Sequence, residues 1–317
     1  MRVIFGYQEP IVQMGMSILM QMSVSEKTEI AHAENVKEKG FAVAAKKQGA
    51  LMLPVIRPSS LSSFMDCGRR AATKLFWREI HGAGFTLRSL PAGIGAATGT
   101  ATHAGMGYML REKMLTGFLG NETEQDQRAL ESLSEQVAPG CTYDATSPNI
   151  NTAQAQVLRQ TRAYRQFIAP TIEPVTIEQR YEAECGNLLL SGQIDILESN
   201  GVISDLKTGT AQRSNVLQYS AYSLLLQTHG ITITGAREDF IRRVAIKNPQ
   251  PEPIRTQIDI GHGEHVVMAT IQRLTRDYEA FIKTGDPLSF AANPMSVLCG
   301  EKWCPAFNSS FCMEHRP

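Results

Sequence analysis

Apolar and polar residues alternate through three consecutive segments near the middle of the chain, "VTIEQRYEAE" (175–184), "LLLSGQIDILE" (188–198) and "GVISDLKT" (201–208). Successive side chains of a strand point to opposite faces, so this period of two predicts three β-strands. Only short breaks separate the segments, and one of them holds the turn sequence "SNG". We therefore expect consecutive antiparallel strands. A further segment, "ITITGAREDFIRRVAI" (231–246), predicts at least one more strand.

Other regions carry apolar residues at the spacing of three and four that is typical of helices. They are 57–80, 93–115, 215–230 and 263–285. In the second, the glycine-rich start predicts Thr100 or Thr102 as the N-cap and His103 in the first turn. Residues 121–170 are predicted to form a largely helical, polar insertion, broken by "APGCTYDATSPN". This order of elements predicts an α/β core with helical additions.

The length and charge of the chain narrow this picture. Its 317 residues fit one elaborated domain, predicted at 51–317, after an N-terminal segment 1–50 of unclear structure. Lys+Arg and Asp+Glu are both 31, so the net charge of zero excludes a broadly basic surface and confines any nucleic-acid site to a local patch. The apolar N-terminal stretch is interrupted by polar residues and lacks a clean cleavage site. We therefore expect a cytoplasmic protein with no membrane partner.

Three charged residues of the predicted strands point to chemistry. Asp205 and Lys207 lie two residues apart and so share one face of their strand, with Leu206 on the other. Asp195 precedes them by enough residues for a strand to end, turn and return. Two carboxylates at strand ends can bind a hard cation such as Mg²⁺, and a lysine beside them can orient the attacking water or offset charge on a phosphate. The alternative is a surface hairpin with a weak Asp205–Lys207 salt bridge, although the apolar flanks favour the metal site.

These residues belong to a longer series of short motifs. In chain order they are "SSLSSFMDCGRR", "GTATH", "SGQID", "DLK" and "QYSAY", the last being an i, i+4 pair formed by Gln218 and Tyr222. Together with the C-terminal cysteines they span residues 59–312. The series resembles the PD-(D/E)XK nuclease superfamily, in particular the RecB-like branch that includes phage exonucleases and CRISPR-associated adaptation nucleases. The resemblance implies a restriction-endonuclease-like core, in which a central mixed sheet is flanked by helices.

The resemblance also implies a role for each motif residue. Asp195 and Asp205 would bind a catalytic Mg²⁺ or Mn²⁺, with the Leu206 carbonyl and His103 completing the metal shell, and Lys207 would position the nucleophilic water. Gln218 and Tyr222 would bind the DNA backbone or brace the site, and Glu178 would be an outer acid on the neighbouring strand. The basic residues of the N-terminal helix would contact phosphates, although a solvated helix face is an equal alternative; they are Arg69, Arg70, Lys74 and Arg78.

The cysteines suggest a second metal site. Cys299, Cys304 and Cys312 lie close together in an aperiodic tail, and Cys67 lies far away in the N-terminal helix. Three clustered thiolates with a fourth elsewhere match a four-cysteine metal site. The resemblance implies a [4Fe–4S] cluster that joins the two ends of the domain, with zinc or plain reduced thiols as the alternatives. Cys141 and Cys185 are expected to take no part.

The expected function is a metal-dependent DNA nuclease that needs a free DNA end and acts in recombination, replication or repair. A phage origin and a recombination or replication partner protein belong to this expectation. A CRISPR-adaptation nuclease or a structure-specific endonuclease of the same fold is the first alternative. A non-catalytic DNA-binding module is the second, and the intact set of Asp195, Asp205 and Lys207 argues against it.

Overall fold

A mixed six-stranded sheet forms the centre of the part of the chain that the computed structural model describes, residues 53–261 and 263–312. Its strands are β1 (Val55–Ile56), β4 (Pro174–Cys185), β5 (Leu188–Glu198), β6 (Val202–Gly209), β7 (Gly235–Arg242) and β8 (Ile254–Ile258). The three alternating segments form β4, β5 and β6, and both of their pairings are antiparallel, as predicted. The fourth segment forms the single strand β7, which pairs with β6 in parallel after the intervening helix.

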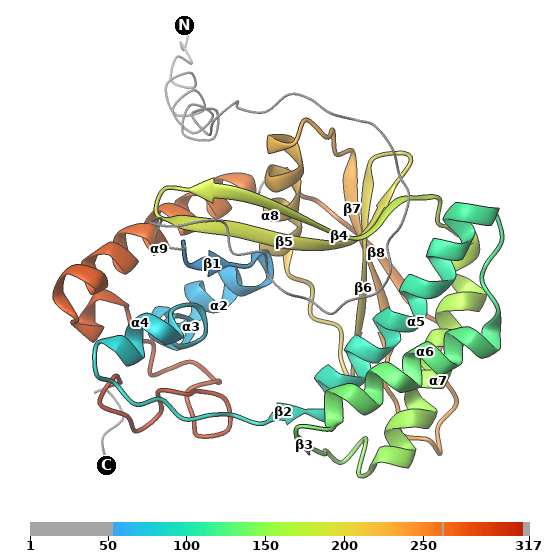
Figure 1. The fold of residues 1–317 in the computed structure, drawn as a ribbon, viewed down its shortest axis with the longest axis horizontal. Helices are drawn as coiled ribbons and strands as arrows, with labels where there is room; N and C mark the ends of the chain where they lie inside the picture. Colours follow the sequence, from blue (N-terminus) through green and yellow to red (C-terminus); the bar gives the residue numbers. More distant parts are fainter. Residues whose placement is uncertain (1–52, 262, 313–317) are drawn as a thin grey trace, which may run out of the picture.

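The two edges of β5 are used differently. β4 pairs with β5 along almost its whole length. The opposite edge is shared, because β1 pairs only with Leu189 and Leu190, and β6 pairs only with Ile196 and Leu197. Among the described residues, positions 191–195 of β5 therefore have no strand partner on this edge. Figure 1 shows the result: β4 and β5 run across the molecule, whereas β6, β7 and β8 run down from it.

One set of helices packs beside β1 and β5. The set contains η1 (Pro58–Ser60), α2 (Leu61–Asp66), α3 (Gly68–Leu75), α4 (Trp77–Gly82), α8 (Val216–Thr228), α9 (Glu264–Thr284) and η3 (Pro287–Ser289). The helices at 215–230 and 263–285 are confirmed, but the predicted helix 57–80 is divided at Cys67 and Phe76. The backbone of Cys67 is extended (φ −152°, ψ 104°), which ends one helix and caps the next. Buried aromatic rings, including those of Phe76, Phe281 and Phe311, hold the C-terminal tail against this region.

A second group of helices, the helical lobe, lies on the other side of the sheet (Figure 1). It consists of α5 (Ile94–Thr116), α6 (Glu122–Val137) and α7 (Ile150–Phe167), with the short strands β2 (Ala92–Gly93) and β3 (Cys141–Thr142) and η2 (Ala169–Thr171). Residues 121–170, predicted to be an insertion, contain α6 and α7, with the short strand β3 between them. No helix in the described ranges is both long and apolar enough to cross a bilayer.

The start of α5 differs from the prediction. Gly93 is the N-cap, so Thr100 and Thr102 lie inside the helix and His103 lies in its third turn. The helix runs through the glycines that follow, and their lack of a side chain allows close packing against neighbouring residues. A Cβ at Gly95 would lie 3.2 Å from Nη2 of Arg243, and one at Gly99 would lie 3.0 Å from Oγ1 of Thr208. These glycines bring the helix close to the sheet.

A buried arginine ties the helical lobe to the end of β7. Arg243 donates to both carboxylate oxygens of Asp144, at 3.1 and 2.6 Å, and to the hydroxyl of Ser147. The guanidinium of Arg243 is nearly inaccessible to solvent, so it depends on these acceptors. Its hydrogen bonds hold the pKa of Asp144 below the usual range, against the opposing effect of burial.

We expect the substitution Asp144→Asn to lower the free energy of unfolding at pH 7 by about 1–3 kcal/mol, because a buried guanidinium loses its counter-charge. An aspartate with a lowered pKa in the folded state stabilises the fold above its unfolded-state pKa and stops doing so as pH falls through the lowered value. Urea unfolding of wild type and variant should therefore differ at pH 7 and converge toward about pH 3. Asp126→Asn, which affects an ion pair with the exposed Arg162, is the matched control and should change stability by less than about 1 kcal/mol. An equal gap between wild type and Asp144→Asn at both pH values would contradict the assignment.

Candidate active site

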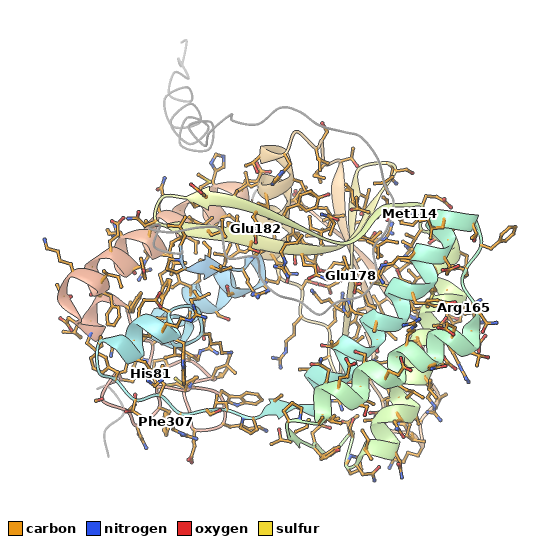
Figure 2. All side chains as sticks on the ribbon, viewed as in Figure 1. His81, Met114, Arg165, Glu178, Glu182 and Phe307 are labelled. Atoms are coloured by element: carbon orange, nitrogen blue, oxygen red, sulfur yellow. The ribbon has the colours of Figure 1, made fainter. Side chains whose placement is uncertain are left out.

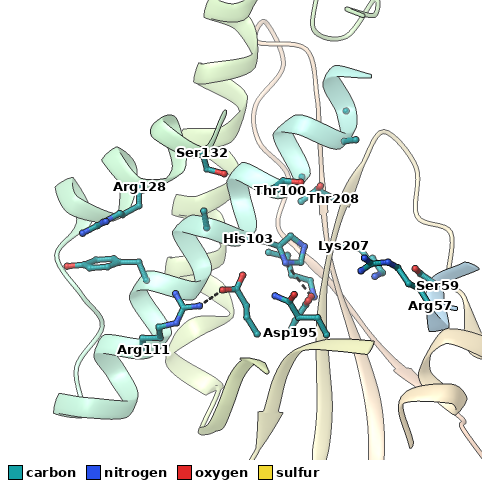
Figure 3. Close-up of a pocket in the computed structure, with 18 of the residues that line it drawn as sticks. Arg57, Ser59, Thr100, His103, Arg111, Arg128, Ser132, Asp195, Lys207 and Thr208 are labelled. Atoms are coloured by element: carbon teal, nitrogen blue, oxygen red, sulfur yellow. Dashed lines mark hydrogen bonds and ion pairs between the residues drawn. The ribbon is translucent and has the colours of Figure 1, made fainter. Parts of the chain in front are cut away.

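A cavity of about 1020 Å³ opens between the helical lobe and the sheet. Residues of α5, β5 and β6 line one side of it, and Arg57 and Ser59, which follow β1, line the other. Figure 3 shows His103 of α5 turned toward Asp195, with Arg57 and Ser59 on the opposite side. Asp195, Leu206 and Lys207 all line this cavity.

The two predicted carboxylates lie where β5 and β6 separate. The last backbone pair between these strands is Ile196 with Ser204, so the next positions in register are Asp195 and Asp205. Because the strands diverge there, the N–H of Leu206 donates to Oδ2 of Asp195 (3.0 Å). Nδ1 of His103 lies 3.4 Å from the same oxygen. The structure thus brings His103, Asp195, Asp205 and Leu206 to one place.

Asp205 and Lys207 share one face of β6, as the period of two predicts. Nζ of Lys207 lies 2.6 Å from Oδ2 of Asp205, while the side chain of Leu206 packs into the core on the other face. Burial, followed by repulsion from Asp195, raises the pKa of Asp205 to about 6 even though Lys207 opposes the shift. Burial alone would favour a neutral lysine, but the two carboxylates outweigh it and raise the pKa of Lys207. Lys207 is therefore a charged ammonium at neutral pH.

Side chains of helix α8 form hydrogen bonds with Asp205. Nε2 of Gln218 lies 3.2 Å from Oδ1 of Asp205 and 3.1 Å from the hydroxyl of Tyr222. Both side chains of this pair are buried, so their position fits the bracing role rather than direct contact with DNA. Burial, followed by the charges of Asp205 and Asp195, raises the pKa of Tyr222, which stays a neutral phenol.

Two further residues of this support, Tyr219 and Glu238, are not among the predicted site residues, although Tyr219 lies within "QYSAY". The hydroxyl of Tyr219 lies 3.2 Å from Oδ2 of Asp205 and 2.9 Å from Oε2 of Glu238. Glu238 of β7 is the register partner of Asp205, and it also accepts hydrogen bonds from Gln212 and Ser214. Burial is the main reason that the pKa of Tyr219 is raised, so this hydroxyl remains protonated as a donor. Glu238 lies in the sequence "GAREDFIR" of β7, where its neighbours Arg237 and Asp239 are also charged, so the local sequence does not single it out.

Glu178 occupies the neighbouring strand, as predicted. It falls between the pairs Ile177–Ile196 and Gln179–Ile194, which places it opposite Asp195, and its backbone has a positive φ of 52°. Its carboxylate forms an ion pair with Arg111 of α5. A Cβ at Gly107 would lie 3.0 Å from Oε2 of Glu178, so this glycine makes room for the pair. Figure 2 shows Glu178 between the sheet and α5.

The burial of Arg69 and Arg70 argues against their predicted phosphate contacts. Only 2% of Arg69 and 5% of Arg70 is exposed. Nε of Arg69 donates to the carbonyl of Phe290, and Nη2 of Arg70 lies 2.6 Å from Asp66. The C-terminal tail covers this face of α3, a long-range contact that the helical pattern does not reveal. Lys74 and Arg78 remain exposed.

The four cysteines predicted to act together line one small cavity between α3 and the tail. Cys67 reaches it from the break between α2 and α3, and the other three reach it from the turns after η3. Burial raises the pKa of Cys304, and burial together with the neighbouring thiols of Cys312 and Cys67 raises that of Cys299. Cys141 in β3 and Cys185 at the end of β4 line neither this cavity nor the one around Asp195.

The site around Asp195 and the cysteine cavity both contain side chains that can bind metals, although neither has them positioned to hold a metal ion among the described residues. In the part of the chain that the structure describes, no three His, Cys, Asp or Glu side chains are grouped so that they could hold a metal ion. The donor chemistry nevertheless fits. Asp195 and Asp205 are oxygen donors; burial, followed by repulsion from Asp195, raises the pKa of Asp205, and a hard cation would relieve that repulsion. The four thiols are the soft donors that zinc and iron–sulfur clusters need.

Comparison with known proteins identifies a family and a similar fold. The family model described as the PD-(D/E)XK nuclease superfamily matches residues 56–306. A solved structure described as a "Putative exonuclease" from Eubacterium rectale is similar with a TM-score of 0.51 and 11% sequence identity, covering 78% of this chain and 87% of the other. A second solved structure, SSO0001, has a TM-score of 0.27 and 9% identity over 62% of this chain and 81% of its own, and carries no argument. No curated protein matches the chain. The likeness to the first structure supports the fold: a central mixed sheet flanked by helices.

Proposed function

The chain belongs to the PD-(D/E)XK nuclease superfamily, and from this premise we propose that it is a Mg²⁺- or Mn²⁺-dependent deoxyribonuclease of the RecB-like branch that degrades DNA from a free end. The observation that carries the proposal is the meeting of Asp195, Asp205 and Lys207 at the point where β5 and β6 separate, inside a cavity. A DNA-binding module without catalysis would have no use for a buried carboxylate, Asp205, that is repelled by the half-buried carboxylate of Asp195.

Each residue has a distinct part in the proposed reaction. Asp195, Asp205, His103 and the Leu206 carbonyl would hold the cation. When bound, a divalent cation supplies Lewis-acid activation of the phosphate and of the attacking water. The ammonium of Lys207, which lines the cavity and pairs with Asp205, would orient that water and offset charge on the phosphate.

The surrounding residues keep this set in place. Gln218 holds Oδ1 of Asp205, Tyr219 links Oδ2 of the same carboxylate to Glu238, and the Leu206 N–H fixes Asp195. Because these partners are hydrogen-bond donors, they favour the charged carboxylates that a cation requires. This is the pre-organisation that a metal-dependent hydrolase needs.

The second part of the proposal is a [4Fe–4S] cluster on Cys67, Cys299, Cys304 and Cys312. Its support is the convergence of these cysteines, from sequence positions far apart, on one cavity. The cluster would join the N-terminal helices to the tail and so act as structure rather than in the hydrolysis. A zinc ion is the alternative occupant.

The proposed dependence on a DNA end follows from the walls of the catalytic cavity. Arg57 and Ser59 close one side, and residues of α5 and α6 close the other, including Thr100 and Ser132. A strand end can be threaded between such walls more readily than a continuous duplex. We therefore expect purified protein with Mg²⁺ or Mn²⁺ to degrade linear DNA to short products while covalently closed circles survive the same incubation.

Gel analysis of end-labelled linear DNA beside closed circular DNA checks this expectation. The control is the same circle cut once with a restriction enzyme, which should become a substrate. Rapid nicking or linearisation of the closed circle would replace the exonuclease proposal with an endonuclease of the same fold.

A further inference from the structure

A second cavity, of about 1030 Å³, lies between α3, α4, β3 and the C-terminal tail. We refer to it as the aromatic cavity, because Trp77, Trp303 and Tyr143 all line it. Trp77 is 39% exposed and Trp303 is 48% exposed, which is unusual for the largest apolar side chains. These are the only two tryptophans of the chain. Figure 1 shows the segment from α4 to β2 running along the same side of the molecule as the tail.

The charges of the aromatic cavity leave ammonium groups available. Its acids are already paired, because Glu301 forms an ion pair with Arg88 (3.3 Å) and Asp144 is held by Arg243. Lys74 is exposed and has no ion-pair or hydrogen-bond partner among the described residues. Nζ of Lys302 lies 4.8 Å from the centroid of the Trp303 ring. The cavity therefore combines exposed aromatic side chains with the ammonium groups of Lys74 and Lys302, neither of which forms an ion pair with a described residue.

The aromatic cavity adjoins the catalytic cavity at the start of α5. Gly93 and Ile94 line the first, and the next residues, Gly95 and Ala96, line the second. A chain of nucleotides lying across Trp77 and Trp303 would therefore reach the cavity that holds Asp195 and Lys207. Because the two cavities are adjacent, a nucleic-acid strand is the ligand that best fits this aromatic and cationic surface.

We propose that the aromatic cavity binds the unpaired nucleotides of a single DNA strand, with bases stacked on Trp77 and Trp303 and phosphates near Lys74 and Lys302. Base-on-aromatic stacking tolerates any sequence because every base has a π-face, whereas the base faces inside a duplex are already covered. The site therefore selects single strands. Its role in delivering substrate rests on the proposed nuclease function, but its binding of a strand does not.

The tryptophans themselves report on binding, since both lie in this cavity. In EDTA, which prevents metal-dependent cleavage, an oligothymidylate of about twelve nucleotides should quench tryptophan fluorescence in a saturable way, and a duplex of equal length should do so far less. By anisotropy of a labelled strand, Trp77→Ala and Trp303→Ala should each weaken binding by roughly 5- to 100-fold. Trp77→Phe and Trp303→Phe, which keep an aromatic face, should restore most of it. Lys74→Ala should reduce the slope of log affinity against log salt by about 0.7.

Phe118→Ala is the matched control, because Phe118 is a highly exposed aromatic residue that does not line the cavity, and it should bind as wild type. Wild-type affinity in the Trp77→Ala/Trp303→Ala double variant would overturn the proposal. Equal quenching by duplex, or none by either DNA, as expected of a protein-docking surface, would do the same. Strand binding in EDTA without any cleavage in Mg²⁺ or Mn²⁺ would support this site while refuting the nuclease proposal. Cleavage of linear DNA without quenching would do the reverse.

Discussion

The substitution Asp205→Asn should reduce the rate of DNA cleavage by about 1000-fold or more while leaving the protein folded. Asp205 lies beside Lys207 and opposite Asp195, so its loss removes a charged ligand from the proposed cation and a partner from the lysine. The raised pKa of Asp205 means that the folded protein accommodates the neutral acid better than the carboxylate. At neutral pH the charge therefore costs stability, and asparagine, which lacks it, should melt at the same temperature or higher in EDTA.

Single-turnover cleavage and thermal unfolding of the same samples measure both effects. The matched control is Asp239→Asn, which removes another buried carboxylate from the adjacent strand β7, on the face away from the cavity. That variant should cleave at close to the wild-type rate at a temperature where it is folded. The double variant Asp195→Asn/Asp205→Asn should be little slower than either single variant, because residues that act on one phosphate lose activity as a unit. A wild-type rate for Asp205→Asn would show that the catalytic site lies elsewhere.

The substitution Cys67→Ser or Cys304→Ser should abolish bound iron and lower the melting temperature by on the order of 10 °C. Metal-binding free energy is part of folding free energy, and several kcal/mol correspond to such a shift in a chain of this size. The loss should be large because Cys67 and the tail cysteines come from segments that pack together around the same aromatic core. The wild-type protein, purified without oxygen, should be brown and contain iron and acid-labile sulfide.

The chain supplies its own controls for this experiment. Cys141→Ser and Cys185→Ser alter cysteines outside the cavity and should keep the colour, the iron and the melting temperature. Colourless wild-type protein with stoichiometric zinc would keep the four-cysteine site but change its occupant. Full iron content in Cys67→Ser would remove that residue from the site.

The sequence predicts structural features that depend on neighbouring residues better than features that depend on contacts between residues far apart in the chain. The alternation that predicts β4, β5 and β6 is local, and the shared face of Asp205 and Lys207 follows from the same period. Strand β8 is short, partly exposed and preceded by prolines, so its weak alternation does not predict a strand. The gap along β5 is not predictable in this way, because it arises from pairing with β1 and β6, which are far apart in sequence.

The residues that hold Asp205 in place also include some that local sequence patterns cannot predict. Gln218 and Tyr222 follow from helical spacing, but Glu238 meets Asp205 only through the parallel register of β6 and β7. The burial of Arg69 depends on the tail, whose Phe290 carbonyl accepts its hydrogen bond. A charged helix face normally indicates solvent, and only the position of the tail shows otherwise.

The close approach of α5 to the sheet has a consequence for folding. Glycine is less favourable than alanine in a helix by about 1 kcal/mol, and α5 contains Gly95, Gly99, Gly105 and Gly107. This helix is therefore weak on its own and is stabilised mainly by docking against Thr208, Glu178 and Arg243 of the sheet region and Thr161 of α7. It should consolidate after the strands and the neighbouring helices have assembled. We therefore expect His103 to join Asp195 late in folding, so that partly folded chains, including those still being synthesised, would carry an incomplete and inactive form of the proposed site.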